Sequence, residues 1–314
     1  MHKFIFGRPS TGRVIFNQQI MFIKAIEEAA NFTRAIHTIL RTYAGKQIIP
    51  GAATIFFVNE EGYAITCKHV IELLATSDKL VKHYANFKTE RDKLPRDAKY
   101  QRNLKGLELK YKFNPETEIQ VKNTFVDCVD YMSGVTWHLH PKYDLAILKF
   151  DNFKNLLYKN YAVFKKDTSQ VKQGKYLCRL GFPFPEFTNF KYTEATDDIE
   201  WTTTGINSSP RFPLEGMITR FLVDDNKVFG IEMSTPGLRG QSGGPLFDQD
   251  GIIYGMQFAT KHLHLGFDLI DKEILINNKV KKVSDYSFIH LGQCIHVDAI
   301  KEFLREKQVN FYEE

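Results

Sequence analysis

A glycine-rich hexapeptide, Gly-Gln-Ser-Gly-Gly-Pro at residues 240–245, constrains this chain more than any other stretch. The glycines around Ser242 let the backbone bend sharply and bring N–H groups close to another molecule. Serine is a weak nucleophile unless a base removes its proton and nearby donors hold the oxyanion that forms. Taken alone, the loop fits either an ordinary turn or a nucleophile loop, so the rest of the chain decides between them.

Short β-rich runs separated by turns lie on both sides of residue 155. Residues 51–58 and 63–69 flank Asn-Glu-Glu-Gly and predict a hairpin whose second strand ends in His69. Residues 217–223 and 228–233 predict another hairpin in the second half. The chain is therefore expected to be mainly β, in an arrangement compatible with two small barrels.

Three other segments stand apart from the β-rich runs. Apolar residues recur every three or four positions over residues 18–43 and predict a long amphipathic helix. Residues 76–115 are dense in Lys and Arg and are expected to form a solvated, partly ordered insertion, or else a basic surface for an acidic partner. Residues 297–305 predict a short C-terminal helix.

The composition is that of an ordinary globular chain. It has 314 residues, 43% apolar and 25% charged, with a net charge of +5 that does not indicate nucleic acid as a partner. No apolar run reaches the roughly 18 residues that a membrane span needs, and the N-terminus lacks a signal-peptide pattern. We therefore expect a cytoplasmic protein that does not bind membranes. The four cysteines are far apart and predict buried free thiols: Cys67, Cys128, Cys178 and Cys294.

A serine nucleophile needs a base and a carboxylate that orients the base. His69 lies at the end of a predicted strand, and Asp144 opens the buried-looking run Leu-Ala-Ile-Leu. A carboxylate in such a place needs a partner. The order His69, Asp144, Ser242 is one of the known solutions for this triad.

These residues carry a resemblance to a known family. Thr-Cys-Lys-His-Val at residues 66–70 resembles the histidine motif of trypsin-like (chymotrypsin-fold) serine proteases, closest to the bacterial, HtrA-like branch. Residues 144–148 are similar to its aspartate motif, D-L-A-x-L, and residues 240–246 to its serine motif, G-x-S-G-G-P-L. The resemblance covers roughly residues 48–305, without the predicted helix and the basic insertion.

The resemblance implies two six-stranded antiparallel β-barrels, residues 48–155 and 156–310, after an N-terminal extension at residues 1–47. It implies Ser242 as nucleophile, His69 as base and Asp144 as the orienting carboxylate. The backbone N–H groups of Gly240 and Ser242 would form the oxyanion hole. Protein or peptide substrates would lie against a set of residues around the two strands nearest the serine: Pro236, Gln257, Phe258, Ala259 and Thr260.

Two departures from the family bear on function. Gln241 occupies the position where digestive members carry an aspartate that pairs with a new N-terminus, so activation by that cleavage is not expected. The expected pocket for the side chain before the cleaved bond (P1) has no acidic residue, which disfavours a basic P1 and leaves a small or apolar one. After residue 305 we expect no room for a PDZ domain of the HtrA type.

No cofactor or metal is predicted. The pairs His138-x-His140 and His262-x-His264 each place two imidazoles on one strand face, but neither has a third ligand at a convincing spacing. Three interpretations stay open: a serine endopeptidase, a catalytically silent binding module with a protease fold, and a latent protease that a partner controls through the predicted helix or the basic insertion.

Overall fold

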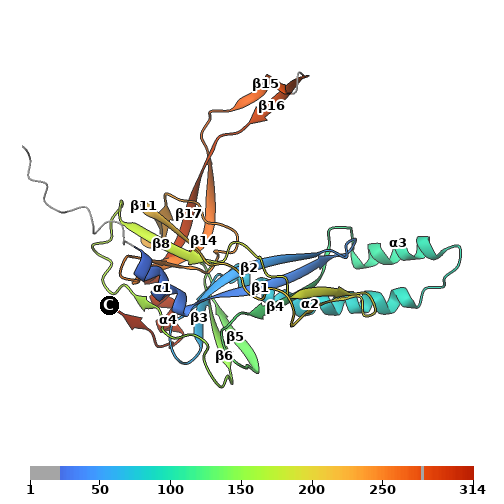
Figure 1. Cartoon of the computed structure of the whole chain (residues 1–314), viewed down its shortest axis with the longest axis horizontal. Coiled ribbons are helices and arrows are strands. Elements are labelled where there is room, and N and C mark those ends of the chain that lie inside the picture. The colour runs from blue at the N-terminus through green and yellow to red at the C-terminus, as the bar shows by residue number, and fades with distance from the viewer. Residues whose placement is uncertain (1–21, 277–278) are drawn as a thin grey trace, which may run out of the picture.

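The computed structural model describes residues 22–276 and 279–314. Two antiparallel β-sheets form the body of the molecule, and two long projections leave it in different directions (Figure 1). Within the described residues, no helix is both long and apolar enough to cross a membrane. All four cysteines are buried and free, as predicted.

The first sheet contains six antiparallel strands in the order β4-β1-β2-β3-β6-β5. Its end strands β4 and β5 are not paired with each other in the described structure, so this is a curled sheet rather than a closed ring. The strands have the bounds β1 Thr33–Thr42, β2 Ile48–Phe57, β3 Tyr63–Thr66, β4 Glu118–Phe125, β5 Gly134–Leu139 and β6 Ala146–Asp151.

The second sheet contains a closed ring of six antiparallel strands. The order β13-β8-β11-β12-β17-β14 is closed by pairing of β14 with β13. Short strand β7 pairs with β14 in parallel, and β18 pairs in parallel with β7. The strands have the bounds β7 Val163–Phe164, β8 Tyr176–Gly181, β11 Phe212–Asp224, β12 Lys227–Met233, β13 Pro245–Phe247, β14 Ile253–His264, β17 Phe288–His296 and β18 Tyr312–Glu313.

The hairpin predicted at residues 217–233 is confirmed as β11 and β12. Its turn residues Asp225 and Asn226 both have positive φ, 47° and 63°, a backbone region that Asp and Asn tolerate better than most residues.

One hydrophobic core joins the two sheets to helix α1 (Ile23–Phe32) and helix α4 (Val297–Glu306). Burying these large side chains against one another packs the two sheets together, and at their junction the Thr66 hydroxyl at the end of β3 lies against Gly243, just before β13. Its members come from every one of these parts and include Phe32, Phe56, Ile65, Leu180, Phe247 and Phe303.

The predicted N-terminal helix is present but much shorter than residues 18–43. Residues 18–21 lie outside the described structure, α1 ends at Phe32, and residues 33–42 form β1, which pairs with both β2 and β4. The helical expectation for this half was wrong. Half of the β1 residues are β-branched, and such residues pack well on a pleated sheet and lose rotamer freedom in a helix.

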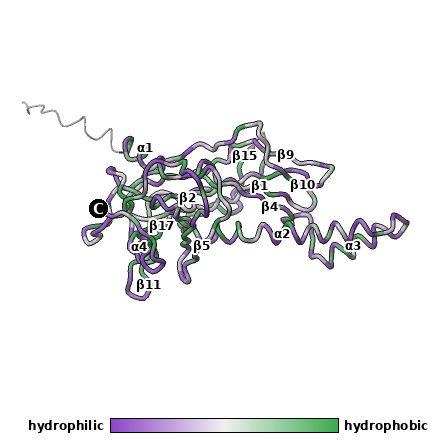
Figure 2. The backbone as a smooth tube through the Cα atoms, turned by 90° about the horizontal axis from the view of Figure 1, so that it is seen from below, coloured by the Kyte–Doolittle hydropathy of each residue, from purple (hydrophilic) through white to green (hydrophobic). Residues whose placement is uncertain are grey.

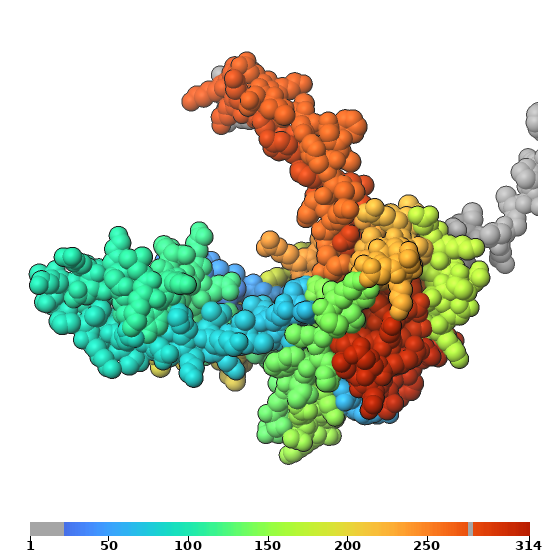
Figure 3. Space-filling model, turned by 180° about the vertical axis from the view of Figure 1, so that it is seen from behind, coloured from blue at the N-terminus to red at the C-terminus, as the bar shows by residue number. Residues whose placement is uncertain are grey.

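The basic insertion at residues 76–115 is also more regular than predicted. It forms a two-helix arm from α2 (Lys68–Asp92) and α3 (Tyr100–Tyr111), seen as the long projection in Figures 1 and 3. Figure 2 shows hydrophobic residues interrupting the hydrophilic ones along both helices. Tyr84, Phe87, Leu107 and Phe113 make a small core inside the arm, so its charges lie on the outer faces.

Two separate β-ribbons complete the chain. β9 (Phe190–Thr193) pairs with β10 (Asp198–Trp201) and lies beside the first sheet and α2. β15 (Leu269–Ile276) pairs with β16 (Lys279–Asp285) and forms the second projection, beyond the ends of β14 and β17 (Figure 3).

Candidate active site

His69 lies in the first turn of α2 and not at the end of a strand as predicted, because β3 ends at Thr66. Thr66, the last residue of β3, donates its hydroxyl to the Thr54 carbonyl at 2.7 Å, and buried Cys67 connects the strand to the helix. The Cys67 thiol lies 3.3 Å from the Gln257 carbonyl of the second sheet. Burial raises the pKa of the Cys67 thiol, so it stays protonated and is a poor nucleophile.

Asp144 ends a tight turn before β6. The turn is held by the His140 ring, whose Nδ1 accepts hydrogen bonds from the backbone N–H groups of Lys142 (3.1 Å) and Tyr143 (2.9 Å). The Asp144 carboxylate Oδ1 accepts a hydrogen bond from the backbone N–H of His69 at 3.0 Å, and Oδ2 lies 2.6 Å from His69 Nδ1. Asp144 thereby caps the N-terminus of α2, where a negative charge is favoured.

This contact sets the charge of Asp144 and the tautomer of His69. Burial by itself raises the pKa of Asp144, but the hydrogen bonds from the ring and backbone of His69 outweigh it, so the pKa lies below its usual range. An ionised carboxylate only accepts hydrogen bonds, so Nδ1 of His69 carries a proton, and in the neutral imidazole Nε2 is the nitrogen that can accept one. The imidazole is therefore oriented as a general base requires.

The serine loop is held by close backbone contacts with the first sheet. Gly240 and Gly243 have positive φ, 89° and 87°, on either side of Ser242. Thr54 donates its hydroxyl to the Gly240 carbonyl at 2.7 Å and its N–H to the Ser242 carbonyl at 2.9 Å. A Cβ on Gly243 would lie 2.0 Å from the Thr54 carbonyl oxygen, so only glycine fits. The motif's glycines are thus required by the docking of the loop on β2.

Two of the four backbone N–H groups at residues 240–243 are occupied and two are open. The N–H groups of Gln241 and Gly243 donate to the carbonyls of Leu238 (3.0 Å) and Gln257 (2.9 Å). Within the described chain, the N–H groups of Gly240 and Ser242 have no acceptor. The Gln241 side chain is buried and bonds to the Leu238 N–H and the Phe212 carbonyl, so it braces the loop from within.

His69 and Ser242 border the same two cavities, of about 270 and 590 Å³. No hydrogen bond joins the Ser242 hydroxyl to the His69 ring among the residues that the structure describes. The structure therefore brings the three predicted residues to one place, with the His69–Asp144 contact made and the Ser242–His69 contact open.

The larger cavity is also lined by every residue predicted to bind substrate: Pro236, Gln257, Phe258, Ala259 and Thr260. Arg239, His262 and His290 also line this cavity but were not predicted as substrate-binding residues. His262 and His290 reach it because β14 and β17 continue past the barrel as a paired extension. A signal for His262 existed in the His-x-His pattern, but nothing in the sequence pointed to its cross-strand neighbour, His290.

Within the described residues, neither His-x-His pair gathers a metal-binding set. His140 is engaged by its turn, His264 lies 2.7 Å from Asp268, and the Nδ1 atoms of His262 and His290 are 2.5 Å apart. In the described residues, Cys67, His69 and Asp144 form the one cluster of three ligand types with atoms close enough for a metal. There the imidazole already bonds the carboxylate and burial keeps the thiol protonated, so the cluster is poorly suited to an ion.

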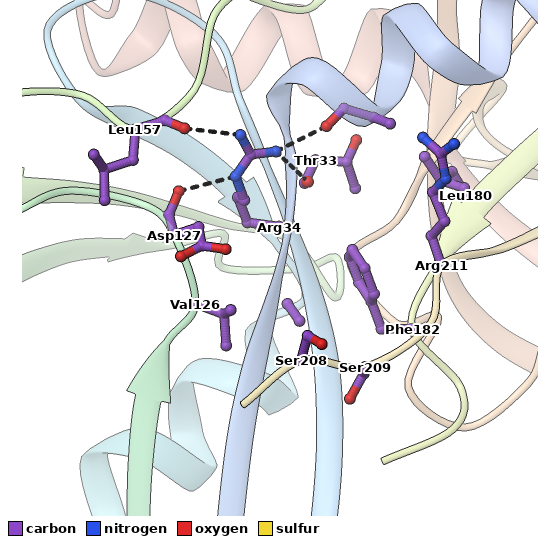
Figure 4. A pocket seen from close by; sticks show the side chains of 12 residues that line it. Thr33, Arg34, Val126, Asp127, Leu157, Leu180, Phe182, Ser208, Ser209 and Arg211 are labelled. Atoms are coloured by element: carbon purple, nitrogen blue, oxygen red, sulfur yellow. Dashed lines mark hydrogen bonds between the residues drawn. The ribbon is translucent and has the colours of Figure 1, made fainter. Parts of the chain in front are cut away.

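A different cavity of about 520 Å³ lies at the junction of α1, β1 and the second sheet (Figure 4). Arg34 projects along its wall and donates to four carbonyl groups at 2.8 to 3.0 Å, those of Ala30, Thr33, Asp127 and Leu157. Arg211 lies on the opposite side and pairs with Glu27. No predicted site residue lines this cavity, and Arg34 serves to hold the end of α1 to the first sheet.

The family model described as the trypsin-like peptidase domain matches residues 53–256, which is more than half of the chain. Solved structures similar to this chain include an HtrA-type protease, AlgW, with a tripeptide (15% identity, TM-score 0.43) and with a decapeptide (14% identity, TM-score 0.44). These alignments cover 90% of this chain. The chain spans 62% and 66% of the lengths of those two chains.

Proposed function

Because this chain belongs to the trypsin-like peptidase domain family, we propose that it is a serine endopeptidase that cleaves protein or peptide substrates. The observation that carries this proposal is the His69 ring, which Asp144 holds at 2.6 Å in the tautomer that leaves Nε2 open beside Ser242. The cavity that His69 and Ser242 share brings this nitrogen beside the serine, as general-base catalysis requires.

In the proposed reaction, the Ser242 hydroxyl attacks the carbonyl carbon of the scissile bond and His69 takes its proton. The open N–H groups of Gly240 and Ser242 hold the oxyanion. The C–N bond then breaks, and His69 passes the proton to the leaving amine, which leaves an acyl-enzyme. Water attacks the ester in turn, gives its proton to His69, and the ester C–O bond breaks as Ser242 regains the proton. Asp144 stabilises the imidazolium that forms in both halves of the reaction.

The test is labelling with a fluorophosphonate, which reacts only with activated serines. We expect labelling of the wild type, none of Ser242→Ala, and a loss of at least about a thousandfold in rate for His69→Ala. Asp144→Asn should fold normally and lower peptide hydrolysis by about ten-thousandfold, because the ring loses its orienting anion. A folded wild type that stays unlabelled would mean either that the enzyme is latent or that the chain is the other candidate, a binding module that retains the fold without turnover.

A latent form of the enzyme is the second part of the proposal. The observation behind it is the open contact between Ser242 and His69, together with the position of His69 at the root of the 25-residue helix α2. Farther along α2, the Tyr84 hydroxyl donates to Asp197 at 2.6 Å and ties the arm to the β9–β10 ribbon. A regulatory protein that binds the basic arm or α1 would act on His69 through this helix.

The variant Tyr84→Phe tests this connection, since it removes one hydroxyl without changing the packing of the ring. We expect the rate of fluorophosphonate labelling to change by about threefold or more, the usual range of coupling through one element. An unchanged rate, with the arm still folded by circular dichroism, would count against control through α2.

A further inference from the structure

Arg179 is a buried cation that the chain itself does not neutralise. It lies on β8 with 0% of its surface exposed. It donates to Gln257 Oε1 at 2.6 Å and to the carbonyl and hydroxyl of Thr235 at 3.0 and 2.6 Å. Its Nε–H has no partner in the described structure, and no carboxylate there lies within ion-pair distance. Arginine keeps its proton inside proteins, so an uncompensated charge remains here.

The buried carboxylates of the described chain are engaged elsewhere. They are Glu232 and Asp248, both in the second half. Glu232 pairs with Arg220 at 2.6 Å, and Asp248 lies 3.7 Å from the Lys175 ammonium. The missing anion for Arg179 therefore has no source among the buried groups around it.

Arg179 lies behind the wall of the 590 Å³ cavity beside Ser242 and determines what that wall presents. Because a guanidinium only donates, the amide oxygen of Gln257 must face Arg179, and its NH₂ group must face the other way. Gln257 Nε2 donates one hydrogen to the Ala259 carbonyl at 2.6 Å. It also lies 2.1 Å from the position that a Cβ on Gly237 would occupy, at the cavity wall. Gln257 is 2% exposed, and within the described residues its second amide hydrogen has no acceptor.

The rest of the cavity lining is also basic or rich in hydrogen-bond donors. Its lining includes Arg239, His262 and His290 and contains neither Asp nor Glu. The Thr260 hydroxyl is occupied as a donor to the Gly237 carbonyl at 2.7 Å, so beside Gly237 the unoccupied side-chain donor is the Gln257 amide. A pocket with a fixed donor, a buried cation behind it and no anion suits a negatively charged side chain.

We propose that this cavity selects an acidic P1 residue, Asp or Glu, whose carboxylate accepts a hydrogen bond from Gln257 Nε2. Arg179 is the positioning residue, because it holds the donor end of the amide toward the cavity and supplies the positive field. The inference rests on the proposed function for the position of P1, and it replaces the sequence-based expectation of a small or apolar P1.

The test compares four product peptides that differ only in the last residue, Glu, Gln, Leu or Lys. Binding is measured by fluorescence anisotropy with the Ser242→Ala protein, so no turnover is needed. We expect the Glu peptide to bind about tenfold tighter than the Gln peptide, because a charged acceptor makes the stronger hydrogen bond. Gln should bind at least as well as Leu, and Lys most weakly.

Three variants in the same background examine the role of Arg179. Arg179→Met should bring the ratio of Glu to Gln affinity close to one while leaving the Leu peptide unchanged, and Arg179→Lys should retain part of the ratio. Arg211→Met, in the cavity of Figure 4, removes the same unit of charge elsewhere and should leave the ratio intact. A Glu preference that survives Arg179→Met, or no Glu preference at all, would overturn the inference.

The two proposals fail in different ways. Peptide binding measures the specificity of the pocket whether or not Ser242 is activated. Fluorophosphonate labelling measures the reactivity of Ser242 and needs no P1 side chain. Labelling without a Glu preference would leave the endopeptidase and remove the acidic specificity. A Glu preference without labelling would leave a pocket for acidic C-termini in a silent module.

Discussion

Each of the two sheets buries one arginine, and the two differ in what neutralises them. Arg41 of the first sheet is 3% exposed, and its guanidinium donates to the Asp197 carboxylate and to Gln120 Oε1, both at 2.8 Å. Arg179 of the second sheet is more deeply buried and has only neutral acceptors.

The surroundings of each charge indicate its use. Arg41 joins β1 to the β9–β10 ribbon and to Tyr84 of the arm, and the Asp197 carboxylate neutralises its charge within the chain. Such a charge stabilises a structure and offers nothing to a ligand. The charge of Arg179 is neutralised only if an anion binds from outside the chain, and the cavity beside Ser242 is where an anion can approach.

The strongest test of this contrast is Arg41→Met. The substitution leaves Asp197 without its closest cation and should lower the free energy of unfolding by about 2–3 kcal/mol, somewhat less than for a fully buried pair because Asp197 is 22% exposed. Denaturant unfolding measures the change. A loss no larger than that of a surface ion pair, about 1 kcal/mol or less, would mean that Tyr84 and Tyr192, which also bond Asp197, hold this carboxylate without Arg41.

A smaller effect is expected from pH. Burial alone raises the pKa of Asp197, but hydrogen bonds from Tyr84 and Tyr192 and the charge of Arg41 outweigh it, so the pKa is lowered on folding. Its contribution to stability is then present above the unfolded pKa of about 4 and is lost as the pH falls through the lower folded value.

The variant Asp197→Asn isolates that contribution. At neutral pH it should be less stable than the wild type by on the order of 1 kcal/mol, and the two unfolding free energies should converge as the pH falls below about 4. A difference that stays constant with pH would assign the effect to packing rather than to charge.

The smallest effect is expected for Arg179→Met. Every acceptor that it would abandon keeps another partner. Gln257 Oε1 has the Cys294 thiol at 3.5 Å, the Thr235 carbonyl has the Gly292 N–H at 2.8 Å, and the Thr235 hydroxyl still donates to the Glu215 carbonyl at 2.9 Å. Replacing a buried charge by an apolar side chain of similar size is often neutral or stabilising. Thermal unfolding should therefore give a stability within about 1 kcal/mol of the wild type. A loss as large as that of Arg41→Met would show that Arg179 is structural and erase the contrast.

Much of the site was predictable because its chemistry is local in sequence. The sharp turn around Ser242 requires glycine where the backbone touches Thr54, and Asp144 needs a partner where a strand becomes buried. Such requirements leave short motifs, and their order along the chain added a second constraint. The predicted hairpins and the C-terminal helix followed from turn residues and periodicity for the same reason.

The errors arose where one pattern fits two structures. Residues 33–42 place apolar side chains at helical spacing, yet pairing with strands on both sides makes them a central strand. The basic insertion looked solvated because charge dominates its composition, whereas a few aromatic residues 3 to 29 positions apart give the arm its core.

By itself, then, the sequence determined the family, the two-sheet architecture and the three residues proposed for catalysis, because each depends on neighbours in the chain. Only the tertiary structure decided what surrounds them. The partners of Arg179 lie 56 and 78 residues away, and His290 meets His262 across 28 residues. The polarity of a pocket is a sum over such distant strands, so it exists only once they pair.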